Sequence, residues 1–289
     1  MIKRDGKKKF FSHSKLSAFE QCNLKYKFRY IDRIIPEIEK TIESHLGSVV
    51  HRTLEWLYTQ VKRKRVPGIE EVISKYSDMW KEDYEDEIPI VKKGMTLEYY
   101  FNKGINFLVN YYIEHKPFDD NTIEVEKEIE LELDEDGIYR IRGFIDRLAY
   151  NIHTDEYEVH DYKTSNHLPS SEDIANDRQL ALYSIAVKEI YGKEKKVRLV
   201  WHYLSFNKRI YSKRTNEQLE KLKEDTLNLI RKIEATKEFA PTKSALCHWC
   251  EYKNICPAWG NKPPEKQTRI DGFVEVKKEE NGEKMDIWN

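Results

Sequence analysis

The sequence has few cysteines, no long apolar run and almost no net charge. Its 289 residues include four cysteines, and 50 Lys and Arg against 51 Asp and Glu give a formal charge of -1. Without an apolar run of about 18 residues there is no candidate for a membrane-spanning helix. The near-neutral balance excludes proteins that hold nucleic acid by bulk positive charge. No apolar stretch follows the basic first ten residues, so we expect a soluble, cytoplasmic protein rather than a secreted one.

What the sequence does contain is enough apolar material for a large core. Hydrophobic residues make up 39% and aromatic residues 12% of the chain, which excludes wholesale disorder. The cysteines are Cys22, Cys247, Cys250 and Cys256, three of them close together near one end. A disulfide framework is not expected in so long a chain without a secretion signal, and the C-x2-C spacing favours one metal or cluster site.

Hydrophobic periodicity predicts an α/β protein. Helical spacing covers residues 14–31, 47–61, 69–84, 97–112, 171–191 and 215–233, with Ser14 and Thr215 as N-caps and Gly192 as a C-cap. Strand patterns cover residues 123–133, 138–150, 157–164 and 197–206, and 209–213 can pair with the last as a hairpin. We expect a helical region over 1–121, an α/β core over 122–236, a cysteine loop over 237–260 and a polar tail over 261–289, all in one compact domain.

Acidic and basic side chains gather where two of the predicted strands meet. Side chains alternate along a strand, so Asp161 and Lys163 project from one face and continue the buried row that begins at Val159. The preceding strand carries Asp146, and hairpin neighbours can bring both carboxylates to one Mg²⁺ or Mn²⁺ ion. Lys163 beside that ion could orient a water or neutralise charge on a phosphate. The alternative is a surface ion pair between Asp161 and Lys163.

These residues belong to a series of motifs that resembles the RecB-like branch of the PD-(D/E)xK nuclease superfamily. The motifs are Gly47-Ser48-Val49-Val50-His51, Gly143-Phe144-Ile145-Asp146-Arg147, Asp161-Tyr162-Lys163 and Gln179-Leu180-Ala181-Leu182-Tyr183. They occur in the order of that branch, and the resemblance runs from Ser14 to Trp259. Ile145 stands where the superfamily name has Pro. The resemblance implies a restriction-endonuclease-like core, in which helices flank a central mixed sheet.

The resemblance also implies roles for these side chains. The metal ligands would be His51, Asp146, Asp161 and the backbone carbonyl of Tyr162. Lys163 would assist the attacking water. Gln179 and Tyr183 lie one helical turn apart, so both could position Lys163 or the scissile phosphate. For Tyr183 an ordinary place on an amphipathic helix is the alternative.

In the same family a distant N-terminal cysteine and a C-terminal C-x2-C-x5-C bind a [4Fe–4S] cluster. The resemblance assigns that role to Cys22, Cys247, Cys250 and Cys256. Four thiolates would also satisfy tetrahedral Zn²⁺, and free thiols are the remaining alternative. A cluster would join the first helix to the C-terminal loop. Because phosphodiester hydrolysis transfers no electron, we expect that cluster to be structural.

The resemblance therefore implies a Mg²⁺- or Mn²⁺-dependent DNA nuclease, an exonuclease or endonuclease acting on single-stranded ends. It would serve DNA repair and recombination or CRISPR spacer acquisition. The alternative is a catalytically silent DNA-binding or scaffold subunit of a larger complex. No Walker A motif is present, so any unwinding would come from a helicase, and a CRISPR integrase is the other candidate partner.

DNA affinity would then come from local surface rather than from net charge. The basic segments are 3–9, 25–33 and 62–65, and the last of these is equally an ordinary solvated face. Tyr26, Phe28, Tyr30 and the helix over 99–112 offer aromatic rings for stacking on unpaired bases, although most of them are expected in the core.

Overall fold

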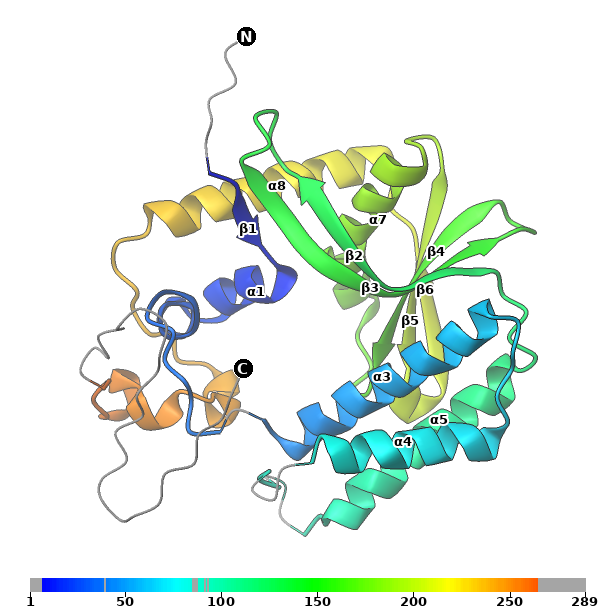
Figure 1. Cartoon of the computed structure of the whole chain (residues 1–289). Helices are drawn as coiled ribbons and strands as arrows, with labels where there is room; N and C mark the ends of the chain where they lie inside the picture. Colours follow the sequence, from blue (N-terminus) through cyan, green and yellow to red (C-terminus); the bar gives the residue numbers. More distant parts are fainter. Residues whose placement is uncertain (1–6, 39, 85–87, 91, 93, 265–289) are drawn as a thin grey trace.

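The computed structural model describes residues 7–38, 40–84, 88–90, 92 and 94–264 (Figure 1). The longer helices are α1 (His13–Gln21), α3 (Ile42–Lys62), α4 (Ile69–Glu82), α5 (Leu97–His115), α7 (Arg178–Tyr191) and α8 (Asn216–Ala235). The short ones are α2 (Asn23–Tyr26), the π-helix η1 (Lys27–Ile31), α6 (Ser171–Ala175) and the 3-10 turns η2 (Leu204–Phe206), η3 (Ala245–Trp249), η4 (Lys253–Ile255) and η5 (Pro257–Trp259).

A mixed six-stranded sheet forms the centre. Its strands are β1 (Lys9–Phe11), β2 (Thr122–Glu132), β3 (Tyr139–Asn151), β4 (Glu156–Lys163), β5 (Lys196–Tyr203) and β6 (Lys208–Ser212). They lie in the order β1-β3-β4-β5-β6, with β2 on the other edge of β3. The β1–β3 and β4–β5 pairs are parallel, and the remaining pairs are antiparallel. The predicted α/β fold with a mixed sheet flanked by helices is therefore confirmed.

One edge of β3 is shared by two partners with a gap between them. Strand β1 pairs with residues 139–141 and β4 pairs with residues 147–151. Within the described chain, no strand pairs with residues 142–146 on that edge. The β2–β3 hairpin thus diverges from β4 just before Arg147, and Asp146 lies at the point of divergence. A split between strands exposes backbone groups, which is where a site can be built.

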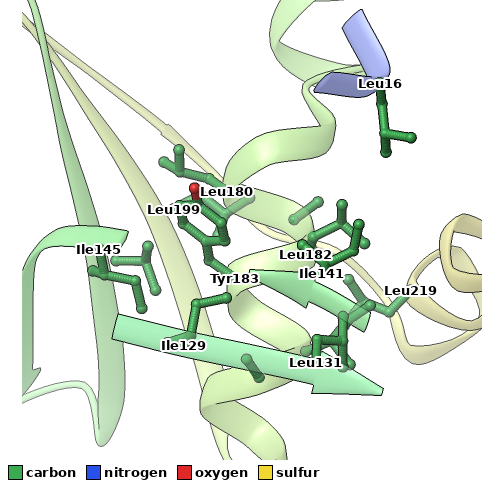
Figure 2. Close-up of a cluster of buried hydrophobic side chains, with 14 of the residues drawn as sticks. Leu16, Ile129, Leu131, Ile141, Ile145, Leu180, Leu182, Tyr183, Leu199 and Leu219 are labelled. Atoms are coloured by element: carbon green, nitrogen blue, oxygen red, sulfur yellow. The ribbon is translucent and has the colours of Figure 1, made fainter. Parts of the chain in front are cut away.

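Helices cover both faces of the sheet and bury a separate apolar layer on each. On one face α1, α7 and α8 pack on the sheet, and Leu180 and Leu182 share one apolar cluster with Ile141 and Ile145 (Figure 2). Ile230 of α8 belongs to the same cluster. On the other face α3, α4 and α5 form a second layer, visible below the sheet in Figure 1. Apolar side chains recur at helical spacing on each of these helices, so burial of one stripe fixes its orientation.

Two helices differ from the sequence-based prediction. The segment 14–31 is not one helix, because Cys22 is extended (φ -166°, ψ 118°) and ends α1. The N-cap is Ser12 rather than Ser14, and its side chain accepts a hydrogen bond from Lys15 N. The segment 171–191 is also interrupted, because α6 ends at Ala175 and α7 begins at Arg178. The side chain of Asp177 accepts a hydrogen bond from Leu180 N and caps α7. The second break comes from local polar capping, whereas Cys22 caps α2 with no side-chain hydrogen bond; periodicity registers neither break.

Other boundaries agree more closely. Thr215 caps α8, Gly192 follows α7, and β6 pairs with β5 as the predicted hairpin. Helix α3 begins at Ile42, earlier than predicted, and the short strand β1 was not anticipated. Residues 3–6 of the first basic segment and 265–289 of the predicted tail lie outside the described residues. Among the helices that are described, none combines the length and apolar character needed to cross a bilayer.

Candidate active site

The end of β4 carries an ion pair whose carboxylate is buried. Asp161 is 5% exposed, and its Oδ2 lies 2.7 Å from Lys163 Nζ. The row begins at fully buried Val159, which packs with the layer under α7. The two side chains therefore share a face, and the pair is not a surface ion pair. The Lys163 side chain keeps 33% of its surface exposed, so the pair joins a buried carboxylate to an ammonium group that solvent can reach.

Helix α3 brings His51 to the same point from the other side of the sheet. Its Nε2 lies 2.6 Å from the carbonyl oxygen of Tyr162, and its Nδ1 lies 3.3 Å from Asp146 Oδ2. The backbone N–H of Tyr162 donates to Asp146 Oδ2 at 2.9 Å. On the β3 side, the split between β3 and β4 leaves Tyr162 without a strand partner. Three of the four predicted ligands, His51, Asp146 and the Tyr162 carbonyl, thus contact one another.

Helix α7 supplies two further polar groups. Lys163 Nζ donates to Gln179 Oε1 at 3.5 Å. Burial raises the pKa of Tyr183, and Gln179 and the backbone of Phe144 oppose the rise. The Tyr183 phenol can reach β3 only because residue 143 is glycine, since a Cβ there would lie 2.4 Å from the phenol oxygen. Figure 2 shows Tyr183 among the buried aliphatic side chains between β3 and α7.

The electrostatics of the site favour a protonated lysine and a carboxyl group that resists ionisation. Burial raises the pKa of Asp161 to about 6, with Asp146 adding to the rise and Lys163 opposing it. Burial alone would lower the pKa of Lys163, but Asp161 raises it above its ordinary value. Burial likewise opposes charge on His51, yet the hydrogen bond and charge of Asp146 raise its pKa. Two carboxylates this close repel, and a cation between them would relieve the repulsion.

Cleavage should accordingly depend on pH through cation binding. Below about pH 6 Asp161 takes up a proton, and His51, with its raised pKa, is protonated too, so both lose their ability to hold a cation. Each competing proton contributes about tenfold per pH unit, so we expect the Mg²⁺ concentration for half-maximal cleavage to rise up to about 100-fold for each pH unit below about 6. Titrating Mg²⁺ at a series of pH values measures this. A requirement that stays constant from about pH 7 to about pH 5 would contradict the assignment.

The donor types at this site fit a hard divalent cation. Two carboxylates, a backbone carbonyl and an imidazole are ligands that Mg²⁺ and Mn²⁺ accept. Within the described ranges, however, no three or more His, Cys, Asp or Glu side chains are gathered as a metal site. The contacts explain this, because Asp161 is turned toward Lys163 and both nitrogens of His51 are engaged with Tyr162 and Asp146.

Two acidic residues near the site were not predicted from the sequence. Glu126 lies on β2 between the residues that pair with Arg147 and Ile145, and its φ of 45° is in the left-handed region although the strand continues through it. Burial, Asp146 and Glu55 raise its pKa to about 7, whereas His51 opposes the rise. Glu55 lies four residues after His51 on α3, a spacing that could have revealed it. The register of the β2–β3 hairpin could have revealed Glu126.

The four cysteines, from both ends of the chain, line one pocket. Figure 1 places the C-terminal segment that carries three of them beside the first helices. Two thiols accept backbone N–H groups at 3.4 Å, Cys22 from Thr242 and Cys247 from Ser244. An apolar cluster of Leu24, Phe28 and Tyr252 backs the pocket. N–H groups directed at sulfur and an apolar wall suit thiolate ligands.

Comparison with known proteins identifies a family. A model of the PD-(D/E)XK nuclease superfamily matches residues 10–257. A crystal structure of a "Putative exonuclease" from Eubacterium rectale has a TM-score of 0.50 at 13% identity, covering 91% of this chain and 94% of that one. The crystal structure of SSO0001 has a TM-score of 0.34 at 18% identity, covering 73% of this chain and 95% of that one. A search of curated proteins finds no match.

Proposed function

Because the chain belongs to the PD-(D/E)XK nuclease superfamily, we propose that it is a metal-dependent deoxyribonuclease that hydrolyses phosphodiester bonds at single-stranded DNA ends. The observation that carries the proposal is the ion pair of buried Asp161 with Lys163, beside Asp146 and His51. A protein that only held DNA would have no use for a buried carboxylate with a raised pKa beside a second acid and an imidazole.

Each side chain has a role in this proposal. His51, Asp146, Asp161 and the Tyr162 carbonyl would hold Mg²⁺ or Mn²⁺. When bound, the cation supplies Lewis acidity and a nucleophilic water at neutral pH. The ammonium group of Lys163 donates a hydrogen bond toward the attacking water or the charge that develops on the phosphate. Gln179 accepts from Lys163 and so fixes its direction.

The test is digestion of end-labelled single- and double-stranded DNA with Mg²⁺ or Mn²⁺, with EDTA as the control. We expect cleavage of the single strand that requires the cation. Asp161→Asn keeps the size of the side chain but removes its charge, and should lower the rate by at least about 100-fold. Asp155→Asn, in the exposed turn between β3 and β4, is the matched control and should cleave normally.

The proposal fails if Asp161→Asn cleaves as fast as the wild type, or if the wild type binds DNA but cleaves neither substrate with either cation. The second result would favour a DNA-binding subunit. Preference for the double strand would leave the chemistry in place but contradict the assignment of single-stranded ends.

We further propose that Cys22, Cys247, Cys250 and Cys256 hold a structural [4Fe–4S] cluster. Their convergence on one pocket from the two ends of the chain supports this. Such a cluster would fix the extended turn at Cys22 and the short 3-10 turns of the C-terminal loop, which bury little apolar surface of their own. Small, loop-rich segments commonly need a metal or disulfide to hold their shape.

Cys22→Ser should remove the cluster and loosen the C-terminal loop. We expect loss of iron, sulfide and visible absorption after anaerobic purification, together with faster proteolysis near residue 245. Ser14→Ala on the same helix is the control and should keep wild-type iron content. A colourless wild-type protein with stoichiometric zinc would overturn the cluster and assign the thiols to Zn²⁺.

A further inference from the structure

The cysteine loop exposes large aromatic rings. Trp249 at the end of η3 is 72% exposed and Trp259 at the end of η5 is 40% exposed. Tryptophan is usually well buried, so two exposed rings in one short loop are unusual. Neither ring belongs to the apolar cluster that backs the cysteines. Trp259 also lines the cysteine pocket, whereas Trp249 does not, so packing around the cysteines does not account for the Trp249 ring.

Two lysines lie over one of these rings. Lys243 Nζ is 5.2 Å and Lys253 Nζ is 5.0 Å from the centre of the Trp259 ring, and the His248 ring is 5.9 Å away. The ring attracts both ammonium groups, which repel each other. We call Lys243, His248, Trp249, Lys253 and Trp259 the aromatic–lysine surface.

Two acidic side chains of this region, Glu251 and Glu37, are engaged with groups other than these lysines. The carboxylate of Glu251 faces Lys25 at 3.0 Å and Arg29 at 3.8 Å. Glu37 accepts a hydrogen bond from Asn254 at 2.7 Å. The loop together with the adjoining first helices thus carries an excess of positive charge, although the whole chain is nearly neutral. An anionic partner would complement this surface.

A helix and an ion pair connect the surface to the active site. Arg178, the residue before Gln179, binds Glu20 of α1 with Nη2 2.7 Å from the carboxylate. Glu20 lies two residues before Cys22, whose thiol lines the pocket of the loop. One helix and one ion pair therefore span the distance from the lysine–glutamine contact to the loop.

We propose that the aromatic–lysine surface binds single-stranded nucleic acid beyond the nucleotides held at the active site. Bases stack on Trp249 and Trp259, and phosphates meet Lys243 and Lys253. Aromatic rings interleaved with basic groups are the arrangement that binds unpaired strands, whereas the core of a protein–protein interface is depleted of lysine. This inference rests on the proposed nuclease function and extends its substrate site.

The test is the affinity for fluorescent single-stranded DNA, measured by anisotropy in EDTA so that nothing is cleaved. Trp249→Ala should weaken binding of an oligonucleotide of about 20 residues roughly 10-fold through loss of stacking. Lys243→Ala with Lys253→Ala should reduce the slope of log affinity against log salt by about 1.4. An oligonucleotide of about four residues is too short to reach from the active site to the aromatic–lysine surface. For it, the ratio of wild-type to variant affinity should approach one.

Matched controls lie elsewhere on the surface. Tyr211→Ala removes an aromatic ring that is 48% exposed on β6, and Lys221→Ala removes an exposed lysine on α8. Both should bind as the wild type does. Iron content and circular dichroism of every variant must match the wild type, so that a collapsed loop is not mistaken for a lost contact. If Trp249→Ala fails to fold, Trp249→Leu removes the stacking surface while keeping an apolar side chain.

The outcomes separate the two proposals. A wild type that cleaves DNA, with variants that bind as tightly as it does at every length and salt concentration, overturns this inference and leaves the nuclease intact. A wild type that neither binds nor cleaves DNA overturns the proposed function itself. Variants with normal DNA binding that fail to capture a protein held by the wild type would assign the surface to that protein instead.

Discussion

Lys163→Ala is expected to lower the rate of single-strand cleavage by about 100- to 1,000-fold, with little change in DNA affinity. This is the usual loss when one preorganised donor to a developing charge is removed. The lysine is held ready by Asp161 at 2.7 Å and Gln179 at 3.5 Å, so wild-type Lys163 need not reorganise during the reaction. Its raised pKa keeps it charged at neutral pH, and the group therefore acts as a hydrogen-bond donor rather than as a base.

The measurement is single-turnover cleavage at saturating Mg²⁺, compared with DNA binding in EDTA. Lys163→Arg keeps the charge but changes the shape of the donor, so partial activity is expected. Lys196→Ala, at the exposed start of β5, is a matched lysine control. Lys163→Ala leaves buried Asp161 without the lysine ammonium group, so the thermal midpoint of this variant must be measured as well. Full activity in correctly folded Lys163→Ala would exclude a catalytic role for this lysine.

Strand alternation allowed the carboxylates and the lysine of the site to be predicted from the sequence. The period of two in β4 places Asp161 and Lys163 on one face, and the hairpin connection brings Asp146 close. His51 was assigned through the resemblance alone. A single histidine on an amphipathic helix has no local signal, and only the packing of α3 on the sheet brings it to the Tyr162 carbonyl.

Features that depend on competition between local and tertiary contacts could not be predicted. Cys22 leaves the helix although its neighbours have helical spacing, and it does so where the thiol meets the C-terminal loop. Strand β1 is only three residues long and pairs in parallel with a strand far away in the sequence. The gap between β1 and β4 along β3, which holds Asp146, follows from that pairing and has no sequence period of its own.

The structure also reveals a buried charge that the motif did not explain. Arg147 is 1% exposed, and its guanidinium group donates to Tyr162 Oη at 3.1 Å, to His160 Nδ1 at 2.9 Å and to Asp120. It also lies 4.1 Å from the centre of the Tyr58 ring. Burial, together with the charge of Arg147, holds the pKa of His160 well below its ordinary value, so the imidazole is neutral and can accept this hydrogen bond.

This network joins β3 to β4 at the last pair before the strands diverge. Arg147 lies opposite His160 in the register, and Tyr162 follows two residues later. The carbonyl and N–H of Tyr162 contact His51 and Asp146, so the direction of the Tyr162 side chain affects both predicted ligands. Arg147 is therefore expected to hold the split open in a fixed geometry as well as to stabilise the fold.

Arg147→Met should consequently lower the free energy of unfolding by about 3–5 kcal/mol, because it leaves Asp120, His160 and the Tyr162 hydroxyl without their common partner. Urea denaturation at neutral pH measures the change. Arg142→Met on the same strand is the matched control. Its guanidinium is 45% exposed and pairs with Glu128 and Glu130, so a loss below about 1 kcal/mol is expected. Equal losses in the two variants would show that the buried network contributes no more than a surface ion pair. The alternative outcome is a large loss of stability confined to Arg147→Met, together with a higher Mg²⁺ concentration for half-maximal cleavage by the molecules that stay folded. That result would connect the arginine of the motif to the placement of the ligands.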